Sequence, residues 1–344
     1  MKKRIISILI ACTMLASAGC SVTVVRDGNE KISADKAVIE ESPERRIEYS
    51  FATKDEGIDL LMSNKEYYDG FTQNELDFKM QKKDAKMDEY LDFAREQVLD
   101  FTEEEKSAID RIMSGIEEKI RENGYVLPEI DPIVFISTTQ KEEPGSAAYT
   151  HGTQIYFNAK WMTSPDKSDI ATLVMAHELF HCLTRSNPGF RKDMYRLIGF
   201  TVQDEDFVIP PSVEEFFISN PDVEHHNAYA AFTIDGEKVD CFTAFVTTRH
   251  FEKEGESFFD YGTTALIPID GRDVYYTLED ASDFYDVFGK NTGYVIDPEE
   301  CMADNFSYAL IYGLDGIEGK GYETPEIIEG ILDYMTGGVS VPSL

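Results

Sequence analysis

Apolar side chains recur at helical spacing through the first third of the chain, between residues 55 and 123. Steps of three and four residues place side chains on one face of a helix. The first apolar stripe consists of Met87, Tyr90, Leu91, Ala94, Val98 and Leu99. The second consists of Ile109, Ile112, Met113, Ile116 and Ile120. We therefore predict that residues 46–128 form a helical N-terminal region, and the stripes are too short to favour the alternative of a coiled coil.

Capping residues mark both ends of the second of these helices. Thr102 and Glu105 have the spacing of a capping box, in which each side chain accepts a hydrogen bond from the backbone N–H of the other residue. Gly124 is a natural stop, because glycine adopts the left-handed conformation that ends many helices. The helix is thus expected to begin after Thr102 and to end before Gly124.

The pattern changes near Pro128, where short apolar segments replace the long stripes. β-branched and aromatic residues in runs of four are typical of buried strands. The predicted strands cover residues 133–136, 147–150 and 154–157. A helix is predicted from about Ser164 to Ser186, where a Pro-Gly pair ends it. We expect residues 129–338 to form a domain of the α+β class with a small mixed sheet.

The chain begins with a short basic and apolar segment. Three basic residues at positions 2–4 precede an apolar run at residues 5–15. This arrangement is typical of a secretory signal, and the run is too short to span a bilayer. Residues 17–20, Ser-Ala-Gly-Cys, resemble the lipobox of bacterial lipoproteins, although Ser17 stands where Leu is usual. An ordinary cleaved signal is the alternative.

The lipobox resemblance implies that residues 1–19 are removed and that Cys20 becomes a lipid-carrying N-terminus. Residues 20–45 are polar and charged without sustained periodicity, as expected of a tether between an anchor and a folded domain. The protein is then expected to be extracytoplasmic and anchored to a membrane by the lipid on Cys20.

The charge balance limits the partners of the protein. Its 344 residues include 32 Lys and Arg against 65 Asp and Glu, a formal net charge of −33 at pH 7. Nucleic-acid binding requires clustered basic residues, so no nucleic acid is expected as a partner. The same charge opposes adhesion to anionic lipid, which leaves the lipid on Cys20 as the expected membrane contact. We interpret the acid excess as a source of solubility, with a cationic substrate as the alternative.

Three cysteines remain if Cys12 leaves with the signal and Cys20 is acylated. They are Cys182, Cys241 and Cys301. They lack the short paired spacings of a zinc ribbon or a redox motif. We predict that they are small buried apolar residues, and the sequence leaves one disulfide open.

The predicted helix that ends at Ser186 contains the sequence His-Glu-Leu-Phe-His at residues 177–181. Residues four apart share a helix face, so the imidazoles of His177 and His181 point the same way and can bind one metal ion. Glu178 lies where its carboxylate can reach a water on that ion. Zinc lowers the pKa of such a water to about 7, and a carboxylate can accept its proton. The alternative is a helix with two hydrogen-bonded histidines and a surface glutamate.

Residues 174–183 fit the extended signature of the zincin metallopeptidases, because the positions beside and between the key residues are uncharged. The order of two strands and a helix before the motif also looks like theirs. The resemblance implies a zincin-like catalytic core, with a small mixed sheet, the motif helix and a second ligand-bearing helix. It implies Zn²⁺ as cofactor and the hydrolysis of peptide bonds. It further implies that a strand within residues 147–157 binds the substrate in extended form.

A catalytic zinc site has three protein ligands and an open position. The Gly and His that follow the motif in metzincins are absent after His181. The spacing of Glu300 and Asp304 resembles instead the second helix of the gluzincins, the thermolysin-like zincins. That resemblance implies Glu300 as the third ligand and Asp304 as a hydrogen-bond partner of a ligand imidazole, which we expect to be that of His177. The alternative is a capping box formed by Asp297 and Glu300.

Further candidates lie between these two segments. A peptidase of this kind needs a donor that stabilises the developing oxyanion, commonly a His or a Tyr. We predict that His225, His226 or Tyr229 has this catalytic role, with a polar loop as the alternative. If Glu300 only caps its helix, the third ligand is expected among His225, His226, Glu214, Glu215 and Asp240. Two other histidines are interpreted as structural, His151 and His250.

The expected function is hydrolysis of a peptide or protein substrate by water that is activated on zinc, with Glu178 as the base. One alternative is a surface lipoprotein that binds metal without catalysis, although a purely structural site has no use for Glu178. A second alternative is a surface interaction protein with an accidental motif. The metal content of the purified protein would separate that alternative from the two metal-binding interpretations.

Overall fold

The computed structural model of the protein describes residues 47–337, and residues 1–46 and 338–344 lie outside this part. The predicted signal, the tether and Cys20 therefore lie outside the described residues. The chain from Ile47 onward forms one compact unit. Helices and two sheets both contribute to it, so the expected α+β class is confirmed.

The helical N-terminal region contains more than the two predicted helices. Its helices are α1 (Lys54–Ser63), α2 (Lys65–Asp69), α3 (Gln73–Met80), α4 (Met87–Gln97) and α5 (Glu103–Asn123). The ends of α5 are those predicted from its caps. Thr102 and Glu105 form the capping box, and Gly124 ends the helix with a left-handed φ of 66°.

The first sheet is small and mixed, as the sequence predicted, and draws strands from several parts of the chain. Its order is β1–β3–β5–β4, with β2 paired to β3. The strands are β1 (Tyr49–Phe51), β2 (Val98–Leu99), β3 (Ile133–Thr138), β4 (Ala148–His151) and β5 (Gln154–Phe157). β3 is parallel to β1 and β5, whereas β4 and β2 pair antiparallel. β4 stands at the edge, so one of its sides presents backbone groups that no strand of the described residues pairs.

Val98 and Leu99 depart from the helical stripe predicted for them. α4 ends at Gln97, and the two residues pair with Thr138 and Ser137 as strand β2. Val98 is completely buried there. The β-branched side chain suits a buried strand, and pairing satisfies the backbone groups of both residues.

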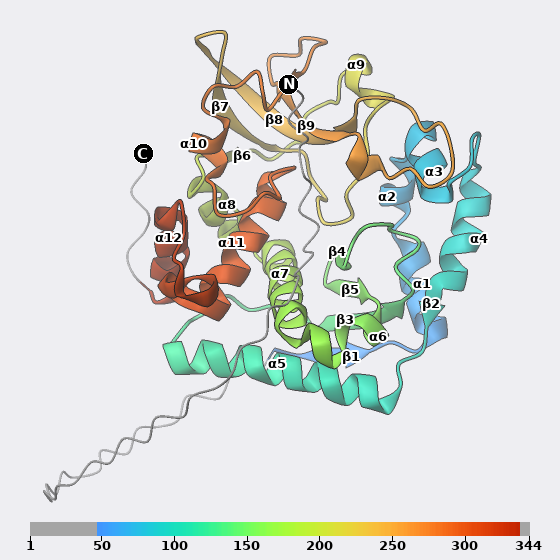
Figure 1. Cartoon of the computed structure of the whole chain (residues 1–344), viewed down its shortest axis with the longest axis vertical. Coiled ribbons are helices and arrows are strands. Elements are labelled where there is room, and N and C mark those ends of the chain that lie inside the picture. The colour runs from blue at the N-terminus through green and yellow to red at the C-terminus, as the bar shows by residue number, and fades with distance from the viewer. Residues whose placement is uncertain (1–46, 338–344) are drawn as a thin grey trace, which may run out of the picture. The chain divides into compact units, whose positions relative to one another are not determined.

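Helices cover both faces of the first sheet (Figure 1). Phe135 and Phe157 lie in the main apolar core with residues of α5 and of the motif helix. Ile136 and Tyr156, one residue away in the same strands, pack with residues of α1, α2 and α4 instead. Successive strand residues point to opposite faces, so this alternation gives the sheet two buried sides.

The motif helix is α7 (Ser168–Ser186), and it begins later than predicted. Residues from Ser164 onward first form a 3-10 turn, η1 (Pro165–Lys167), before α7 starts at Ser168. The other helices of the second region are α6 (Ala159–Met162), α8 (Pro188–Arg196), α9 (Pro211–Glu214), α10 (Phe284–Phe288), α11 (Pro298–Tyr312) and α12 (Pro325–Met335). Three more 3-10 turns are η2 (Phe258–Asp260), η3 (Gly313–Asp315) and η4 (Ile317–Gly319).

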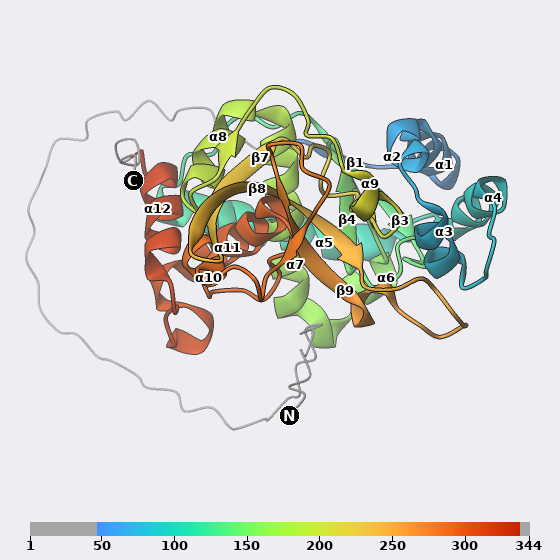
Figure 2. The same cartoon turned by 90° about the horizontal axis from the view of Figure 1, so that it is seen from above.

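A second sheet, which the sequence did not predict, is entirely antiparallel. Its order is β10–β9–β8–β7–β6. The strands are β6 (Thr201–Val202), β7 (Ala228–Ile234), β8 (Glu237–Thr247), β9 (Gly262–Pro268) and β10 (Tyr276–Thr277). In Figures 1 and 2, α7 runs through the middle of the described unit, with the first sheet on one side and α11 and α12 on the other.

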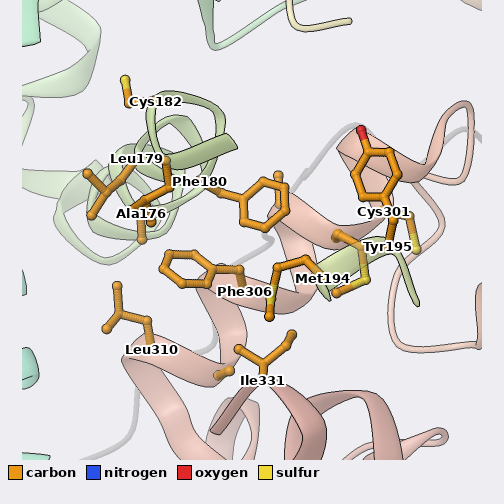
Figure 3. Packing of buried hydrophobic residues seen from close by; sticks show 14 of the residues in the cluster. Ala176, Leu179, Phe180, Cys182, Met194, Tyr195, Cys301, Phe306, Leu310 and Ile331 are labelled. Atoms are coloured by element: carbon orange, nitrogen blue, oxygen red, sulfur yellow. The ribbon is translucent and has the colours of Figure 1, made fainter. Parts of the chain in front are cut away.

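The packing of α7 against α11 forms the centre of the main core (Figure 3). The rings of Phe180 and Phe306 face each other across this contact, with centroids 5.5 Å apart. Cys182, Cys241 and Cys301 are buried and carry free thiols, as predicted for small apolar residues. Among the described residues, no helix is long and apolar enough to span a membrane.

Candidate metal centre

The crossing of α7 and α11 brings together residues that are far apart in the sequence. His177 and His181 lie one turn apart on α7, with ring centroids separated by 4.8 Å. Glu300, in the first turn of α11, points its carboxylate at both rings. Its Oε2 lies 3.0 Å from His177 Nε2 and 3.7 Å from His181 Nε2. One nitrogen from each ring and one carboxylate oxygen therefore converge on a single point.

Asp304 lies on the far side of His177, one helical turn after Glu300. Its Oδ1 is 2.9 Å from His177 Nδ1, and its other oxygen accepts a hydrogen bond from Thr292. Burial disfavours a charge on His177, but the hydrogen bonds to Asp304 and Glu300 outweigh it and hold the pKa of the imidazole well above its usual value. The carboxylates of Asp304 and Glu300, which favour a proton on this ring, also favour a metal cation beside it.

His181 is oriented by Glu299, a residue that the sequence analysis did not single out. Glu299 Oε1 lies 3.0 Å from His181 Nδ1 and also accepts hydrogen bonds from Thr184 at 2.6 Å and from Arg185 at 2.8 Å. Burial alone would raise the pKa of Glu299. Arg185 and His181 have the larger, opposite effect and hold the pKa below its usual value, so the carboxylate stays ionised. Tyr195 donates a further hydrogen bond to it. The signal in the sequence was Arg185, an arginine one turn after the second motif histidine on an otherwise apolar helix.

The donor set fits a metal ion. Atoms of His177, His181 and Glu300 lie within 4.8 Å of one another. His181 Nε2 is buried and has no hydrogen-bond partner among the described residues. A buried polar atom without a partner is unfavourable, so it requires an explanation. Two imidazole nitrogens and a carboxylate oxygen are ligands that Zn²⁺ accepts.

Glu178 lies beside this set in a buried position. Its Oε2 accepts a hydrogen bond from Thr150 Oγ1, on β4, at 2.7 Å. Burial raises the pKa of Glu178, although the neighbouring imidazoles lower it. The carboxylate is therefore held by one hydroxyl donor in a place where accepting a proton is favourable.

Asp222 is a further acid at the site that the sequence analysis did not assign. Its Oδ1 accepts a hydrogen bond from the backbone N–H of Thr150 at 2.6 Å and lies 3.9 Å from His181 Nε2. Burial raises its pKa well above the usual value, and the charges of Glu178 and Glu300 add to this effect. Glu178, His181 and Asp222 also offer atoms within 4.8 Å of one another.

The second oxygen of Glu300 is bound by Tyr294 and Asn220. The Tyr294 hydroxyl donates to Glu300 Oε1 at 3.1 Å, and Asn220 donates to the same atom. The ring of Tyr294 also lies 6.2 Å from that of His177, nearly parallel to it. Sequence reasoning missed both residues, because loops bring them to α11 and no periodicity marks them.

Of the three predicted catalytic helpers, His225 lines a pocket that Asp222 and Glu299 also line, whereas the contacts found for His226 and Tyr229 are with other residues. His225 is exposed and lies 3.2 Å from Asp206. His226 Nδ1 lies 3.2 Å from the carbonyl oxygen of Thr243. Tyr229 belongs to β7, where it packs with apolar residues of the second sheet. The catalytic role of these three residues stays a prediction.

Among the described residues, none of the alternative third ligands belongs to a group of donor atoms that includes His177 or His181. Glu214 and Asp240 are exposed, and Glu215 lies 3.8 Å from His250. The capping-box alternative for Glu300 is wrong as well. Asp297 caps α11 by accepting from the backbone N–H of Glu299 at 2.8 Å, while Glu300 faces the imidazoles.

Comparison of the chain with family models, with curated proteins and with solved structures finds no match. The function must therefore be argued from the geometry of the site itself.

Proposed function

We propose that the protein is a zinc-dependent hydrolase that cleaves peptide bonds. The observation that carries the proposal is the convergence of His177 Nε2, His181 Nε2 and Glu300 Oε2 on one point. Two imidazoles and one carboxylate are the ligands of the catalytic zinc in thermolysin. The resemblance of residues 174–183 to the zincin signature, and of Glu300 and Asp304 to the gluzincin second helix, agrees with this assignment.

The three ligands would be held by their own partners. Asp304 fixes the ring of His177, Glu299 fixes that of His181, and Tyr294 steadies Glu300. Such partners set the tautomer and the direction of each ligand, and their loss typically weakens metal binding or activity 10-fold to 100-fold. When bound, zinc would polarise the scissile carbonyl and acidify the attacking water.

Glu178 is the residue assigned to proton transfer. Burial raises its pKa, so it can accept a proton from the attacking water and pass it to the leaving amine. We assign to Tyr294 the role predicted for His225, His226 or Tyr229, because its hydroxyl lies beside Glu300 and could turn its one hydrogen from Glu300 to the developing oxyanion. On one side of β4, which no described strand pairs, N–H and C=O groups suit a peptide in extended form, and that peptide would replace Asp222 as the acceptor for the N–H of Thr150.

The N-terminal segment supports an extracytoplasmic, membrane-anchored peptidase. Its basic, apolar and small residues end at Cys20, the residue that the lipobox resemblance marks for acylation. The substrate would then be a peptide or protein outside the cytoplasm.

A metal-binding lipoprotein without catalysis is the second candidate. Asp222 favours it, because the carboxylate of Asp222 lies 3.9 Å from His181 Nε2, although this residue is not one of the three proposed ligands. Glu178 favours the hydrolase, because a closed structural site has no use for a buried acid beside the ligands.

The experiment that separates the candidates combines metal analysis with a digest of an internally quenched peptide library. Wild type is expected to bind one zinc per chain and to cleave, and His177→Ala is expected to lose stoichiometric zinc. Glu178→Gln should retain zinc and lose roughly 100-fold to 10,000-fold in rate, the usual contribution of a general base. Asp169→Asn, at the exposed start of α7, is the matched control and should behave as wild type. Full zinc binding by His177→Ala, or full activity of Glu178→Gln, would contradict the proposal.

A further inference from the structure

A cavity of about 250 Å³ lies beside the metal centre and is lined mainly by the end of α7, by α8 and by the segment of residues 222–227. Two acids in its wall contact His181. Glu299 Oε1 lies 3.0 Å from Nδ1 of that ring, and Asp222 Oδ1 lies 3.9 Å from Nε2. The cavity is smaller than most sites for whole small molecules, so it suits one side chain or one chain end. A group bound there would lie next to a proposed zinc ligand.

The buried acids of this wall already have donors within the protein. Glu299 accepts a hydrogen bond from Arg185 at 2.8 Å, and Glu224 lies 3.3 Å from the same guanidinium. Asp222 accepts a hydrogen bond from the backbone N–H of Thr150 at 2.6 Å. These carboxylates and Arg185 therefore satisfy one another or are satisfied by the backbone, and they leave the charge of the remaining cations uncompensated.

Arg191 is the first of those cations. Its guanidinium donates to the side chain of Asn227 at 2.8 Å and to the backbone carbonyl of His225 at 3.5 Å. The nearest carboxylate oxygen among the described residues, from Glu299, lies 3.8 Å from Nε and is too far for a hydrogen bond. A guanidinium has five N–H donors, so donors remain for a ligand. The ring of Tyr195, 4.7 Å from the guanidinium carbon, fixes the orientation of the group.

Lys192 is the second cation, at the exposed rim of the same cavity. Its Nζ lies 3.8 Å from Asp204, whose side chain is 97% exposed. An exposed ion pair at such a distance contributes little free energy, so Lys192 can exchange it for another anion. Two adjacent cations without a close carboxylate are notable in a chain with a formal net charge of −33. They indicate a ligand that carries a negative charge.

We propose that the cavity binds a carboxylate of the substrate through Arg191, with Lys192 as the second cation. A guanidinium matches a carboxylate in shape, because two parallel N–H donors meet its two oxygens. This inference rests on the proposed function and adds the substrate class. The substrate is a peptide that carries a carboxylate close to the scissile bond, either on an acidic side chain or at a free C-terminus.

The test uses internally quenched hexapeptides in pairs that have Glu or Gln at one position and an amidated C-terminus. A further pair lacks acidic side chains and has a free or an amidated C-terminus. Binding is measured by fluorescence anisotropy with the Glu178→Gln protein supplied with Zn²⁺, and cleavage is measured with wild type. The carboxylate member of one pair should bind and react better by roughly 10-fold to 100-fold, the usual effect of a hydrogen bond to a charged group.

Variants of α8 show whether the two cations cause this preference. Arg191→Gln should abolish it, and Lys192→Gln, at an exposed position that folding tolerates, should reduce it. Arg196→Gln is the matched control, because Arg196 lies on the same helix and forms an exposed ion pair with Asp193. It should keep the preference of wild type. If Arg191 only held Glu299 in place, its loss would weaken both members of a pair equally and leave their ratio unchanged.

Two results would overturn the carboxylate site. One is equal binding, or no binding, of the two members of every pair. The other is a preference that survives both Arg191→Gln and Lys192→Gln. Failure of the proposed function gives a different result, because the peptides would then stay intact, or wild type would bind no zinc, whatever the ratio of the binding affinities.

Discussion

At the scale of single residues, the proposed role of Tyr294 as a hydrogen-bond donor to the oxyanion gives the most specific prediction about catalysis. Its hydroxyl lies 3.1 Å from Glu300 Oε1 and its ring lies against His177. Tyr294→Phe removes one donor to the oxyanion, which typically lowers kcat about 100-fold to 1,000-fold. We expect this loss with little change in KM and with one zinc per chain retained. Steady-state kinetics and metal analysis of the same preparation check it, and a weakened zinc affinity with normal kcat would make Tyr294 a positioning residue for Glu300 instead.

His151 supplies a prediction about pH, because it is buried among tyrosines as a neutral ring. Burial lowers its pKa from 6.5 to about 3, and the charges of Arg185 and Lys79 lower it further. The unfolded chain binds more protons than the folded one between these values, so stability present above pH 6.5 is lost as the pH falls towards 3. The loss attributable to this ring is roughly 2 kcal/mol between pH 7 and pH 5.

His151→Phe keeps an aromatic ring and removes the titration. The variant is therefore expected to lose less stability than wild type when urea unfolding is measured at pH 7 and again at pH 5. Other buried acids titrate in both proteins, so the comparison isolates the imidazole. An equal loss in the two proteins would show that His151 does not titrate on unfolding as its burial requires.

At the scale of elements, the contact between α7 and α11 decides whether the site exists. Phe180 and Phe306 pack 5.5 Å apart within it, and Phe306 is completely buried. Phe306→Ala should lower the free energy of unfolding by roughly 3–5 kcal/mol, the usual cost of such a cavity. Because Glu300 is on the same helix, zinc affinity should fall as well. Leu314→Ala, at an exposed position after α11, is the control, and calorimetry with zinc titration measures both effects. Unchanged zinc affinity in Phe306→Ala would show that the packing of α7 against α11 is not needed to position Glu300.

Helices that carry their own caps were predictable from the sequence. α5 follows its apolar stripe, and α11 follows Asp297 and Pro298. His177 and His181 are separated by a spacing of four, as are Glu300 and Asp304. This spacing places each pair on one helix face whatever the tertiary contacts. For those pairs, the helical period of 3.6 residues is enough to predict that the two side chains lie on the same face.

The rest of the site depends on tertiary contacts between segments that are distant in sequence, and local sequence patterns do not predict those contacts. Asp222 and Asn220 lie in a loop that contacts α3 and Arg185. Asp222 lies near the imidazole of His181, whereas Asn220 donates to Glu300. The prediction chose His225, His226 or Tyr229 from the residues that follow, because a His or a Tyr commonly stabilises the oxyanion. Val98 was assigned to a helix for a related reason, since an apolar period cannot foresee a strand partner forty residues away.

At the scale of the whole molecule, the proposed lipid anchor would determine where the proposed enzyme acts. If Cys20 carries lipid, Cys20→Ser should move the protein from the membrane pellet to the soluble fraction, since the described residues contain no helix that spans a bilayer. Fractionation followed by immunoblotting checks it, with the catalytic variant Glu178→Gln as a control that should stay in the pellet. Unchanged fractionation of Cys20→Ser would point to another means of attachment.

The distance along the chain between the proposed ligands has a consequence for biogenesis. His177 and Glu300 are 123 residues apart in sequence, although their side chains touch. A chain that emerges from the ribosome or crosses a membrane in N-to-C order exposes both imidazoles long before the helix with the third donor has formed. Two imidazoles alone would hold zinc weakly, so the proposed metal would be captured only at the end of maturation. If the protein is the hydrolase proposed above, it would stay inactive in the compartment that makes it, and its activity would begin only where its folding is completed.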